Sequence, residues 1–582
     1  MGILDKKFYY LHKRKVAKNI QNRATLFRRS ALLVFTDAVF DIKVDNRLDL
    51  SFTVRYNNRT SQFKENIMLS KIYSSGVMGI EGYEVTVECS AWDRLPKFDL
   101  VGLPDAAVKE AKNRVQSACE NSGYVFPSLD IMINLAPADI KKEGTVFDLA
   151  IISAIMQSDG IIPRDYDFSD KCIIGELSLS GDVRGVAGVL PMVISARDIG
   201  KKEIYVPYAN RDEAAVVGGI TVYGVKSLKE LVMHFKGEKT LTPIPFSVPD
   251  IHVSAHTGAP DFYDVCGQLK AKRALEIAAA GGHNVLMIGP PGTGKSMLAK
   301  RLSSILPDMD IEEALETTKI HSVSGKLRSG LITERPFRSP HHTVSMPGLI
   351  GGGAYPRPGE ISMAHNGILF LDELPEFSKK TTESLRQPLE DGVVTVTRAA
   401  AKITYPSKFM LVCAMNPCRC GYFGDPDKQC TCTPQGVAKY LEKVSGPLLD
   451  RIDIEIELPS VSYDDISGKG NHGEPSSVIR KRVNEAREFT NKRLAAAGDK
   501  VGTLNANMSV DMIRRHCELD KEASDLMRDA FESLGLSARG HDRVLRVART
   551  IADLDGCDSI NADHIAEAIM YRSLDRKYWK RG

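Results

Sequence analysis

The stretch that decides the fold reads Asn284-Val-Leu-Met-Ile-Gly-Pro-Pro-Gly-Thr-Gly-Lys-Ser296. Residues 284–288 form an apolar run typical of a buried strand, and residues 297–306 have a helical pattern. Between them lies the complete pattern Gly-x-x-x-x-Gly-Lys-Ser, in the strand–loop–helix setting that a phosphate-binding loop requires. A chance glycine-rich loop is the alternative, and this setting argues against it.

Each residue type in the loop has a chemical reason to be there. Glycines let backbone N–H groups curl around phosphates at the N-terminus of a helix. A lysine supplies a point charge for the β- and γ-phosphates, and a serine hydroxyl binds Mg²⁺. The residues expected to bind ATP are therefore Gly289, Pro290, Pro291, Gly292, Thr293, Gly294, Lys295 and Ser296, the last of them also through Mg²⁺.

A second apolar strand, residues 367–371, runs directly into Asp372 and Glu373. We expect Asp372 to hold Mg²⁺ at the carboxyl end of this strand, and Glu373 to orient and deprotonate the attacking water. A solvated acidic pair at a strand end is the alternative. A third apolar strand, residues 409–415, ends in Asn416, which either contacts the nucleotide or caps a turn before Pro417.

Composition limits the function classes. The chain of 582 residues is too long for one core, and its 11 cysteines, an odd number, fit reduced thiols in the cytoplasm better than a disulfide framework. No apolar run reaches the roughly 18 residues that a membrane-spanning helix needs, so no membrane partner is expected. Residues 1–67 hold 14 basic and 6 acidic side chains, which leaves 63 basic and 68 acidic for the rest. Overall charge therefore does not support nucleic-acid binding, which must rest on local loops.

The chain divides by pattern into several parts. Residues 1–67 are basic and have no clear period, so we expect Met68 to be the true start; the alternative is a real basic arm. Residues 68–240 predict an α/β domain with strands at 130–135 and 171–174 and helices at 106–121 and 147–157. The remaining parts are a linker at 241–261, a nucleotide-binding core at 262–460, a loop at 461–475 and a helical region at 476–582, with N-caps expected at Asp511, Asp520 and Asn561.

Four segments carry a family resemblance: residues 261–276, 335–342, 358–366 and 537–554. They resemble the magnesium-chelatase-like AAA+ ATPases, specifically the ComM (YifB) branch, over residues 68–582. Residues 1–67 are a non-family extension. The resemblance implies an α/β fold with an N-terminal Lon-protease-like (ribosomal S5 domain 2-like) domain, a P-loop AAA+ core and a C-terminal α-helical lid.

The same resemblance implies a homo-hexameric DNA helicase that uses ATP to drive branch migration during recombination of transforming DNA. The alternative is a protein-remodelling ATPase akin to the motor subunit of magnesium chelatase. Chelatase motor subunits usually lack the fused Lon-like domain, so its presence favours the DNA motor.

Family resemblance also assigns roles to four polar residues. Asn416 resembles the polar sensor of AAA+ proteins, and Arg539 resembles the sensor 2 arginine, with Arg543 as its rival for the nucleotide. Arg451 resembles an arginine finger that reaches the γ-phosphate of the neighbouring subunit, which requires a ring. The alternative for Arg451 is an intrachain pair with Asp450 or Asp453.

Residues 142–149, 175–183 and 186–191 resemble the proteolytic domain of Lon, which uses a Ser–Lys dyad. Aligning these segments places Val146 at the serine and Leu190 at the lysine, and neighbouring Thr145 has no lysine partner. The resemblance therefore implies a Lon-like fold without peptidase activity, used for binding or ring assembly.

The interval between Lys295 and Asp372 is long enough for inserted loops. Residues 322–338 and 343–355 are candidates, with Lys326, Arg328 and Arg335 able to follow a DNA backbone without reading sequence. The pair His341 and His342 contacts DNA or the nucleotide pocket in one interpretation and is structural in the other.

A cysteine cluster follows Asn416 and comprises Cys418, Cys420, Cys430 and Cys432. Four thiols within fifteen residues suit a tetrahedral Zn²⁺ site, although the Cys-x-Cys spacing is tighter than the usual gap. Four reduced thiols in a surface loop are the alternative.

Overall fold

A computed structural model describes residues 68–248, 260–327, 330–353, 356–398, 402–426, 428–460 and 473–579, together with three short strands before Met68. The chain divides into two compact units, Met1–Ile67 and Met68–Gly582. In the first unit, an antiparallel sheet is formed by β1 (Leu32–Phe35), β2 (Ala38–Val44) and β3 (Leu50–Tyr56).

The second unit begins with a mixed sheet in the order β4-β5-β7-β6, formed by Met68–Met78, Glu81–Trp92, Asp130–Ala136 and Lys97–Val101. Burial alternates along β5, because one face of the sheet packs against helices. The helix α4 (Asp148–Asp159) lies against β4 and β5 and is buried from Asp148 to Ser158. The helix expected at residues 106–121 is interrupted at Glu110, giving α2 (Ala106–Lys109) and α3 (Ala111–Asn121).

A second sheet has the order β13-β12-β11-β8, with strands Pro243–Ile244, Thr221–Val225, Glu203–Pro207 and Lys171–Ile173. Pro243–Ile244 pairs antiparallel with β12, so the first part of the expected linker joins this sheet. The remaining elements here are β9 (Glu176–Leu177), β10 (Val183–Arg184), α5 (Val189–Asp198), α6 (Arg211–Ala214) and α7 (Leu228–Phe235).

The part of the chain that contains the expected phosphate-binding loop is built on a five-stranded parallel sheet in the order β15-β18-β21-β14-β22. Its strands are Phe337–Arg338, Ile368–Leu371, Met410–Met415, Val285–Ile288 and Ile454–Glu457. The three central strands are buried throughout, which explains their uninterrupted apolar sequence. Because the strands are parallel, the residues that follow β14, β18 and β21 meet at one edge of the sheet.

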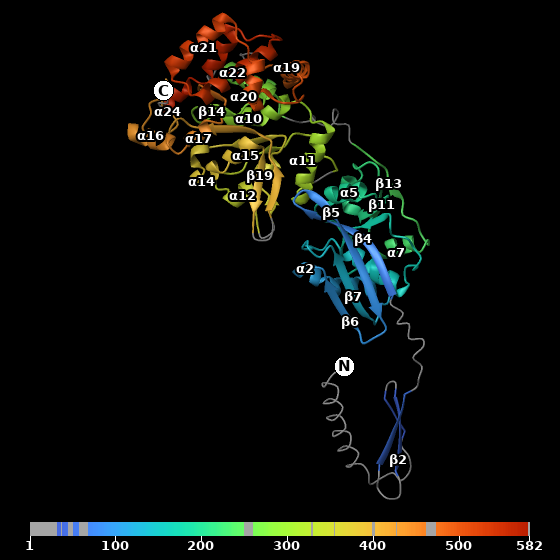
Figure 1. Ribbon diagram of the computed structural model, residues 1–582. Coiled ribbons are helices and arrows are strands. Elements are labelled where there is room, and N and C mark those ends of the chain that lie inside the picture. The colour runs from blue at the N-terminus through green and yellow to red at the C-terminus, as the bar shows by residue number, and fades with distance from the viewer. Residues whose placement is uncertain are drawn as a thin grey trace. The chain divides into compact units, whose positions relative to one another are not determined.

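Helices and hairpins pack on this sheet or extend from it (Figure 1). The longer helices are α9 (Leu269–Gly281), α10 (Lys295–Leu302), α11 (Ile311–Val323) and α16 (Pro434–Leu441). The short ones are α12 (Met346–Ile350), α13 (Glu360–Met363), α14 (Lys379–Glu383), α15 (Arg386–Asp391) and α17 (Gly446–Leu449). Two hairpins are β16 (Gly351–Gly352) with β17 (Arg357–Pro358) and β19 (Val393–Thr397) with β20 (Lys402–Pro406).

The C-terminal part is helical, with α19 (Ser476–Ala496), α20 (Val510–His516), α21 (Lys521–Leu534), α22 (Ala538–Leu554), α23 (Ala562–Met570) and α24 (Leu574–Trp579). Asp520 and Asn561 are N-caps, as expected. The prediction for Asp511 was wrong, because Ser509 caps α20 through its hydroxyl and Asp511 lies within the first turn. An acidic residue in the first turn favours the helix dipole, which makes the two positions hard to distinguish from sequence.

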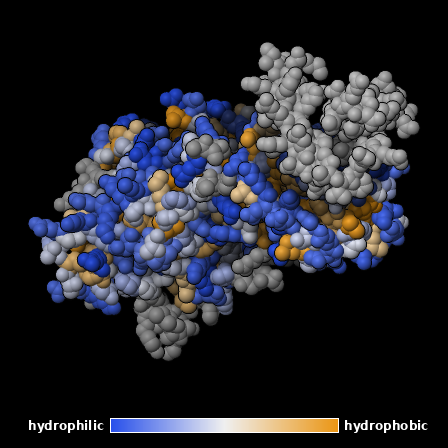
Figure 2. All heavy atoms as spheres, turned by 90° about the horizontal axis from the view of Figure 1, so that it is seen from below, coloured by the Kyte–Doolittle hydropathy of each residue, from blue (hydrophilic) through white to orange (hydrophobic). Residues whose placement is uncertain are grey.

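Hydrophilic side chains predominate on the face shown in Figure 2, with hydrophobic ones in separate groups between them. Among the described residues, no helix combines the length and apolarity that crossing a bilayer requires.

Candidate nucleotide-binding site

The loop between β14 and α10 has the backbone of a phosphate-binding turn. Gly292 and Gly294 adopt φ values of +81° and +86°, which glycine reaches without strain. Gly294 is the N-cap of α10, and Lys295 is the first residue of that helix. Backbone N–H groups without intrahelical partners at the start of a helix favour an anion.

Lys295 is 9% exposed and its amine lies in the centre of the loop. Its Nζ donates hydrogen bonds to the Gly289 carbonyl at 2.7 Å, the Pro290 carbonyl at 2.8 Å and Asn416 Oδ1 at 3.1 Å. Burial lowers the pKa of the Lys295 amine to about 8, against an opposing effect of the Asp372 carboxylate. An ammonium buried among carbonyls would be better compensated by a phosphate.

Ser296 and Asp372 are in direct contact. The Ser296 hydroxyl donates a hydrogen bond of 2.6 Å to Asp372 Oδ2. A hydroxyl and a carboxylate beside a phosphate-binding loop form the oxygen donor set that suits Mg²⁺. The residues present therefore fit the expected cation.

Glu373 follows in an unusual conformation, with φ +53° and ψ +47°. Its side chain is 59% exposed, and Oε2 lies 3.3 Å from Nδ1 of His342. The His342 ring packs against His341, with ring centroids 4.1 Å apart. The contact brings His342 beside Glu373, the expected general base.

Arg451 lies in a tight turn between α17 and β22. Its Nη2 forms an ion pair with Glu390 of α15, and Nη1 donates to the Pro447 carbonyl at 2.6 Å. Only 9% of the side chain is exposed. The intrachain partner shown here is Glu390, whereas the sequence suggested Asp450 or Asp453.

The two rival arginines of α22 have different surroundings. Arg539 lies in the first turn of the helix and is exposed. Arg543, one turn later, is 4% exposed, and its Nη1 lies 3.4 Å from the carbonyl oxygens of both Leu449 and Ile452. Arg539 is thus accessible to a ligand, and Arg543 is engaged with the turn that carries Arg451.

The four cysteines come together. All four Sγ atoms lie within 4.8 Å of one another. The Sγ atoms of Cys418, Cys420 and Cys430 are separated by 3.3 to 3.7 Å. Tetrahedral Zn²⁺ with bonds of about 2.3 Å would place sulfurs about 3.8 Å apart. Backbone N–H groups of Tyr422 and Thr431 help lower the pKa of the Cys420 thiol to about 5, which favours the thiolate. The donor set fits zinc.

The cysteine loop also contacts the phosphate-binding loop. A Cβ atom added at Gly421, which has φ +90°, would lie 2.5 Å from Cδ of Pro291. The two loops therefore pack at a separation that only glycine allows at this position.

Comparison with known proteins places the chain in a family. Three family models match: "Magnesium chelatase, subunit ChlI" over residues 261–466, "Subunit ChlI of Mg-chelatase" over 87–210, and "Magnesium chelatase, subunit ChlI C-terminal" over 473–572. Competence protein ComM of Haemophilus influenzae is 42% identical over 514 residues, covering 87% of this chain and 98% of that protein. Uncharacterized protein YifB of Escherichia coli is 42% identical over 510 residues, with the same coverage of both chains. The chain belongs to the ComM/YifB magnesium-chelatase-like family.

Similarity to chelatase subunits themselves is more distant. The magnesium-chelatase 38 kDa subunit of Rhodobacter capsulatus is 23% identical over 328 residues, covering 52% of this chain and 84% of that protein. Among the relatives described here, ComM/YifB members therefore match over most of their length, and the chelatase subunit matches over about half of this chain.

In this ComM/YifB-family chain, both positions aligned with the Lon dyad are buried core residues. Val146 is 7% exposed and Leu190 is fully buried. The neighbouring Thr145 hydroxyl donates to the carboxylate of Glu176.

The basic residues predicted to contact DNA between Lys295 and Asp372 differ in how exposed and how strongly paired they are. Arg335 pairs with Glu313 at 2.7 Å and donates to the Pro307 and Asn366 carbonyls, so it holds the core together. Lys326 is 56% exposed and lies 3.6 Å from Glu360. Arg328 lies outside the described residues.

Sequence reasoning missed the hairpin β19–β20, which leaves the core as a two-stranded ribbon (Figure 1). Arg398 and Lys402 flank its tip and are both exposed. The signal that could have revealed it is the alternation Val-Thr-Val-Thr in residues 394–397, followed by a second β-branched run. The ribbon carries two cations at its end.

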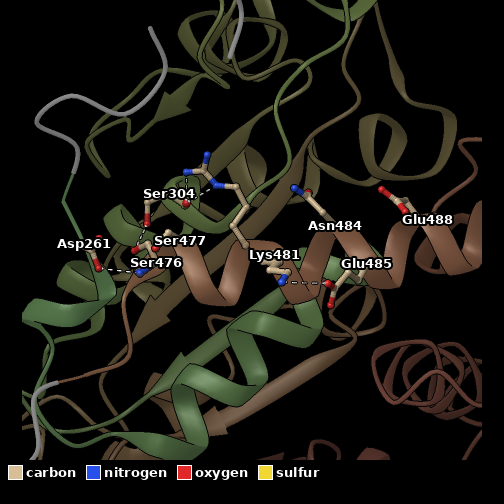
Figure 3. A pocket seen from close by; sticks show the side chains of 9 residues that line it. Asp261, Ser304, Ser476, Ser477, Lys481, Asn484, Glu485 and Glu488 are labelled. Carbon is tan, nitrogen blue, oxygen red and sulfur yellow. Dashed lines mark hydrogen bonds and ion pairs between the residues drawn. The ribbon is translucent and has the colours of Figure 1, made fainter. Parts of the chain in front are cut away.

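A separate cavity of about 580 Å³ lies where α19 meets the core (Figure 3). Its lining includes Asp261, Ser304, Ser476 and Arg480, and Arg480 donates to the Ser304 carbonyl at 2.6 Å. No residue of the phosphate-binding loop lines it, so this cavity is distinct from the site described above.

Proposed function

We propose that this protein is an ATP-hydrolysing ring motor that acts on DNA. The observation that supports it most is the convergence of Lys295, Ser296, Asp372 and Asn416 at one edge of the parallel sheet. Lys295 would exchange its carbonyl and amide partners for the β- and γ-phosphates. Ser296 and Asp372 would hold Mg²⁺, which supplies charge neutralisation between the phosphates.

Glu373 would then take the proton of the attacking water, and Asn416 would position the γ-phosphate. Arg539, exposed at the start of α22, would reach the nucleotide of its own chain. Arg451 would leave Glu390 and reach the γ-phosphate of the next subunit, so that a ring, a hexamer in the family resemblance, is the active unit.

DNA as the substrate rests on three supports. The chain is 42% identical to a protein named for competence over 98% of its length. The magnesium-chelatase subunit of Rhodobacter capsulatus, in contrast, is 23% identical and covers 52% of this chain, so similarity to a chelatase motor is more distant. Finally, Arg398 and Lys402 form an exposed cationic tip, able to track a phosphate backbone without reading bases.

Zn²⁺ would be held by Cys418, Cys420, Cys430 and Cys432 as a structural ion with four thiolate ligands. The cysteine loop starts two residues after Asn416 and packs on Pro291. By holding this loop rigid, the metal would fix the positions of Asn416 and Pro291 relative to each other. Its contribution is to rigidity rather than to the reaction.

A branch-migration assay on four-stranded DNA tests the proposal, with ATP hydrolysis measured in the same samples. We expect strand displacement that requires ATP and is lost in Glu373→Gln. ATP hydrolysis that ignores DNA, without strand displacement, would instead indicate a protein-remodelling motor.

A further inference from the structure

The turn that carries Arg451 is held first by the strand that leads into the phosphate-binding loop. Asn284 Nδ2 donates to the Arg451 carbonyl at 2.8 Å. The Asn284 carbonyl accepts hydrogen bonds from the backbone N–H groups of Asp453 at 3.0 Å and Ile454 at 3.1 Å. The Arg451 turn is therefore fixed in register with the loop that binds the subunit's own nucleotide.

Arg543 of α22 holds the same turn from the opposite end of the chain. Its Nη1 contacts the Leu449 and Ile452 carbonyls, and Nη2 lies 3.8 Å from Asp450 Oδ1. These three acceptors bracket Arg451 in sequence. Since Arg543 is 4% exposed, polar groups of this turn replace part of the water that would otherwise solvate its guanidinium.

A second link joins α22 to the turn through His283. The His283 ring is fully buried, with Nδ1 3.2 Å from Asp453 Oδ2 and Nε2 2.8 Å from the Thr550 hydroxyl. Burial opposes ionisation of Asp453, but the contacts with His283 and nearby arginines outweigh it, so that the pKa of Asp453 is lowered. The pair thus connects a charged residue of the turn to α22.

The helix α22 places its three relevant residues on one side. Arg539, Arg543 and Thr550 are separated by four and seven positions, which brings them within about 40° of one another at 3.6 residues per turn. These residues belong to one continuous helix of 17 residues. A displacement of the end that carries Arg539 is therefore transmitted to the contacts that Arg543 and Thr550 make.

We infer that Arg543 and the His283–Asp453 pair are positioning residues that couple Arg539 in a subunit's own site to Arg451 in its neighbour's site. When Arg539 engages the γ-phosphate, α22 moves the Arg451 turn through these contacts and presents Arg451 across the ring. The inference rests on the proposed function and assigns Arg543 to the turn rather than to the nucleotide.

Mixed rings of two full-length variants test it. The donor chain carries Glu373→Gln, so that its own site still binds ATP and engages Arg539 but does not hydrolyse it, and its Arg451 can serve a neighbour. The acceptor chain carries Arg451→Ala, so that its own site is intact but needs the neighbour's arginine. Neither chain alone should hydrolyse ATP well, and the mixture should recover hydrolysis.

Arg543→Met is then introduced into the donor chain or into the acceptor chain. We expect the recovered rate to fall about 100-fold further when the donor carries it, because a misplaced Arg451 no longer reaches the transition state. Arg487→Met in α19, whose guanidinium donates to the Ala279 carbonyl at 2.7 Å, is the matched control and should affect both arrangements alike.

The outcomes separate the two proposals. Equal losses in both arrangements, or a larger loss in the acceptor chain, would overturn the inference and assign Arg543 to packing or to its own nucleotide. If the mixture of donor and acceptor chains without Arg543→Met does not recover ATP hydrolysis, Arg451 does not act in the neighbouring subunit's site. That result would also overturn the proposed coupling.

Thr550→Val supplies a second variant should Arg543→Met prevent assembly. It removes the partner of His283 and keeps the shape of the side chain. Thr490→Val is its control, because Thr490 is also buried in the helical part but bonds Asp553 at 2.8 Å. A donor-specific loss of about tenfold for Thr550→Val alone supports the inference; matching effects of the two substitutions contradict it.

Discussion

Ser296 Oγ lies 2.6 Å from Asp372 Oδ2, although the two residues are 76 positions apart in sequence. The contact brings together the two oxygen donors proposed for Mg²⁺. Ser296→Ala should raise the Mg²⁺ concentration needed for half-maximal ATP hydrolysis about tenfold, by removing one ligand. Titration of the rate with Mg²⁺ measures it. Ser303→Ala, just after α10, should leave the titration unchanged; an unchanged titration for Ser296→Ala would contradict the assignment.

Glu373→Gln keeps the size of the side chain and removes the base. Hydrolysis should fall by about 10²- to 10⁴-fold while ATP binding persists, because proton transfer is lost and the phosphate contacts are not. Binding of a fluorescent ATP analogue and phosphate release give the two readouts. Glu376→Gln, an exposed neighbour paired with Lys443 at 3.3 Å, serves as the control. Turnover at the unaltered rate in Glu373→Gln would remove Glu373 from the mechanism.

The lowered pKa of Lys295 predicts a pH dependence of ATP binding. Below pH 8 the amine is protonated with or without nucleotide, since its pKa is about 8 in this structure, and affinity does not depend on this group. Bound phosphates favour the charged form, so above pH 8 binding takes up a proton and affinity should fall by up to about tenfold per pH unit. Calorimetry between pH 7 and 10 measures it.

Lys295→Arg is the matched comparison for that experiment, because a guanidinium stays protonated over this range. The variant should bind ATP more weakly but without the alkaline loss. If the affinity for ATP falls equally in both proteins above pH 8, the pH dependence comes from a group other than Lys295.

The cysteine cluster predicts about one zinc ion per chain in the purified protein. Cys430→Ser should lose the metal and lower the melting temperature, since a structural ion contributes to folding. Elemental analysis and thermal unfolding are the measurements. Cys557→Ser, half-buried and outside the cluster, should retain the metal. Metal-free native protein with unaltered stability would support the reduced thiols instead.

The tip of the β19–β20 hairpin predicts a salt-dependent interaction with DNA. Replacing Arg398 and Lys402 by alanine should weaken binding of single strands for all sequences alike. The slope of log K against log salt should decrease by about 1.4, or about 0.7 for each phosphate that one of these cations neutralises. Lys521 and Arg528, exposed on α21, provide an equal change of charge elsewhere. If the two double variants have equal effects on DNA binding, the hairpin has no specific role in binding DNA.

Sequence patterns located the elements that local chemistry determines. The strands before Gly289, Asp372 and Asn416 were expected because buried parallel strands are uniformly apolar, and the parallel sheet then accounts for the meeting of their ends. The glycine pattern likewise anticipated the turn at Gly294. These features depend on residues close together in sequence.

Contacts between distant side chains could not be anticipated in this way. Glu390 lies 61 positions from Arg451, and His283 lies 170 positions from Asp453. Neither pair leaves a periodic trace in the sequence, and several acidic residues near Arg451 were equally good partners. The contact of His342 with Glu373 depends in addition on the path of an irregular segment, which local propensity does not determine.

The helix α11 belongs in sequence to the nucleotide-binding core, yet Met309, Ala314 and Leu331 around it are buried in the same apolar cluster as the N-terminal sheets. The Ser322 hydroxyl donates at 2.5 Å to Glu213, whose pKa is raised by burial. Cutting the chain within the linker at residues 241–261 would therefore expose the apolar surface around α11. It would also remove the Ser322 hydroxyl that donates a hydrogen bond to the buried carboxyl of Glu213. Heating the intact chain should accordingly melt both regions in a single calorimetric transition, and a fragment starting near Pro260 should aggregate.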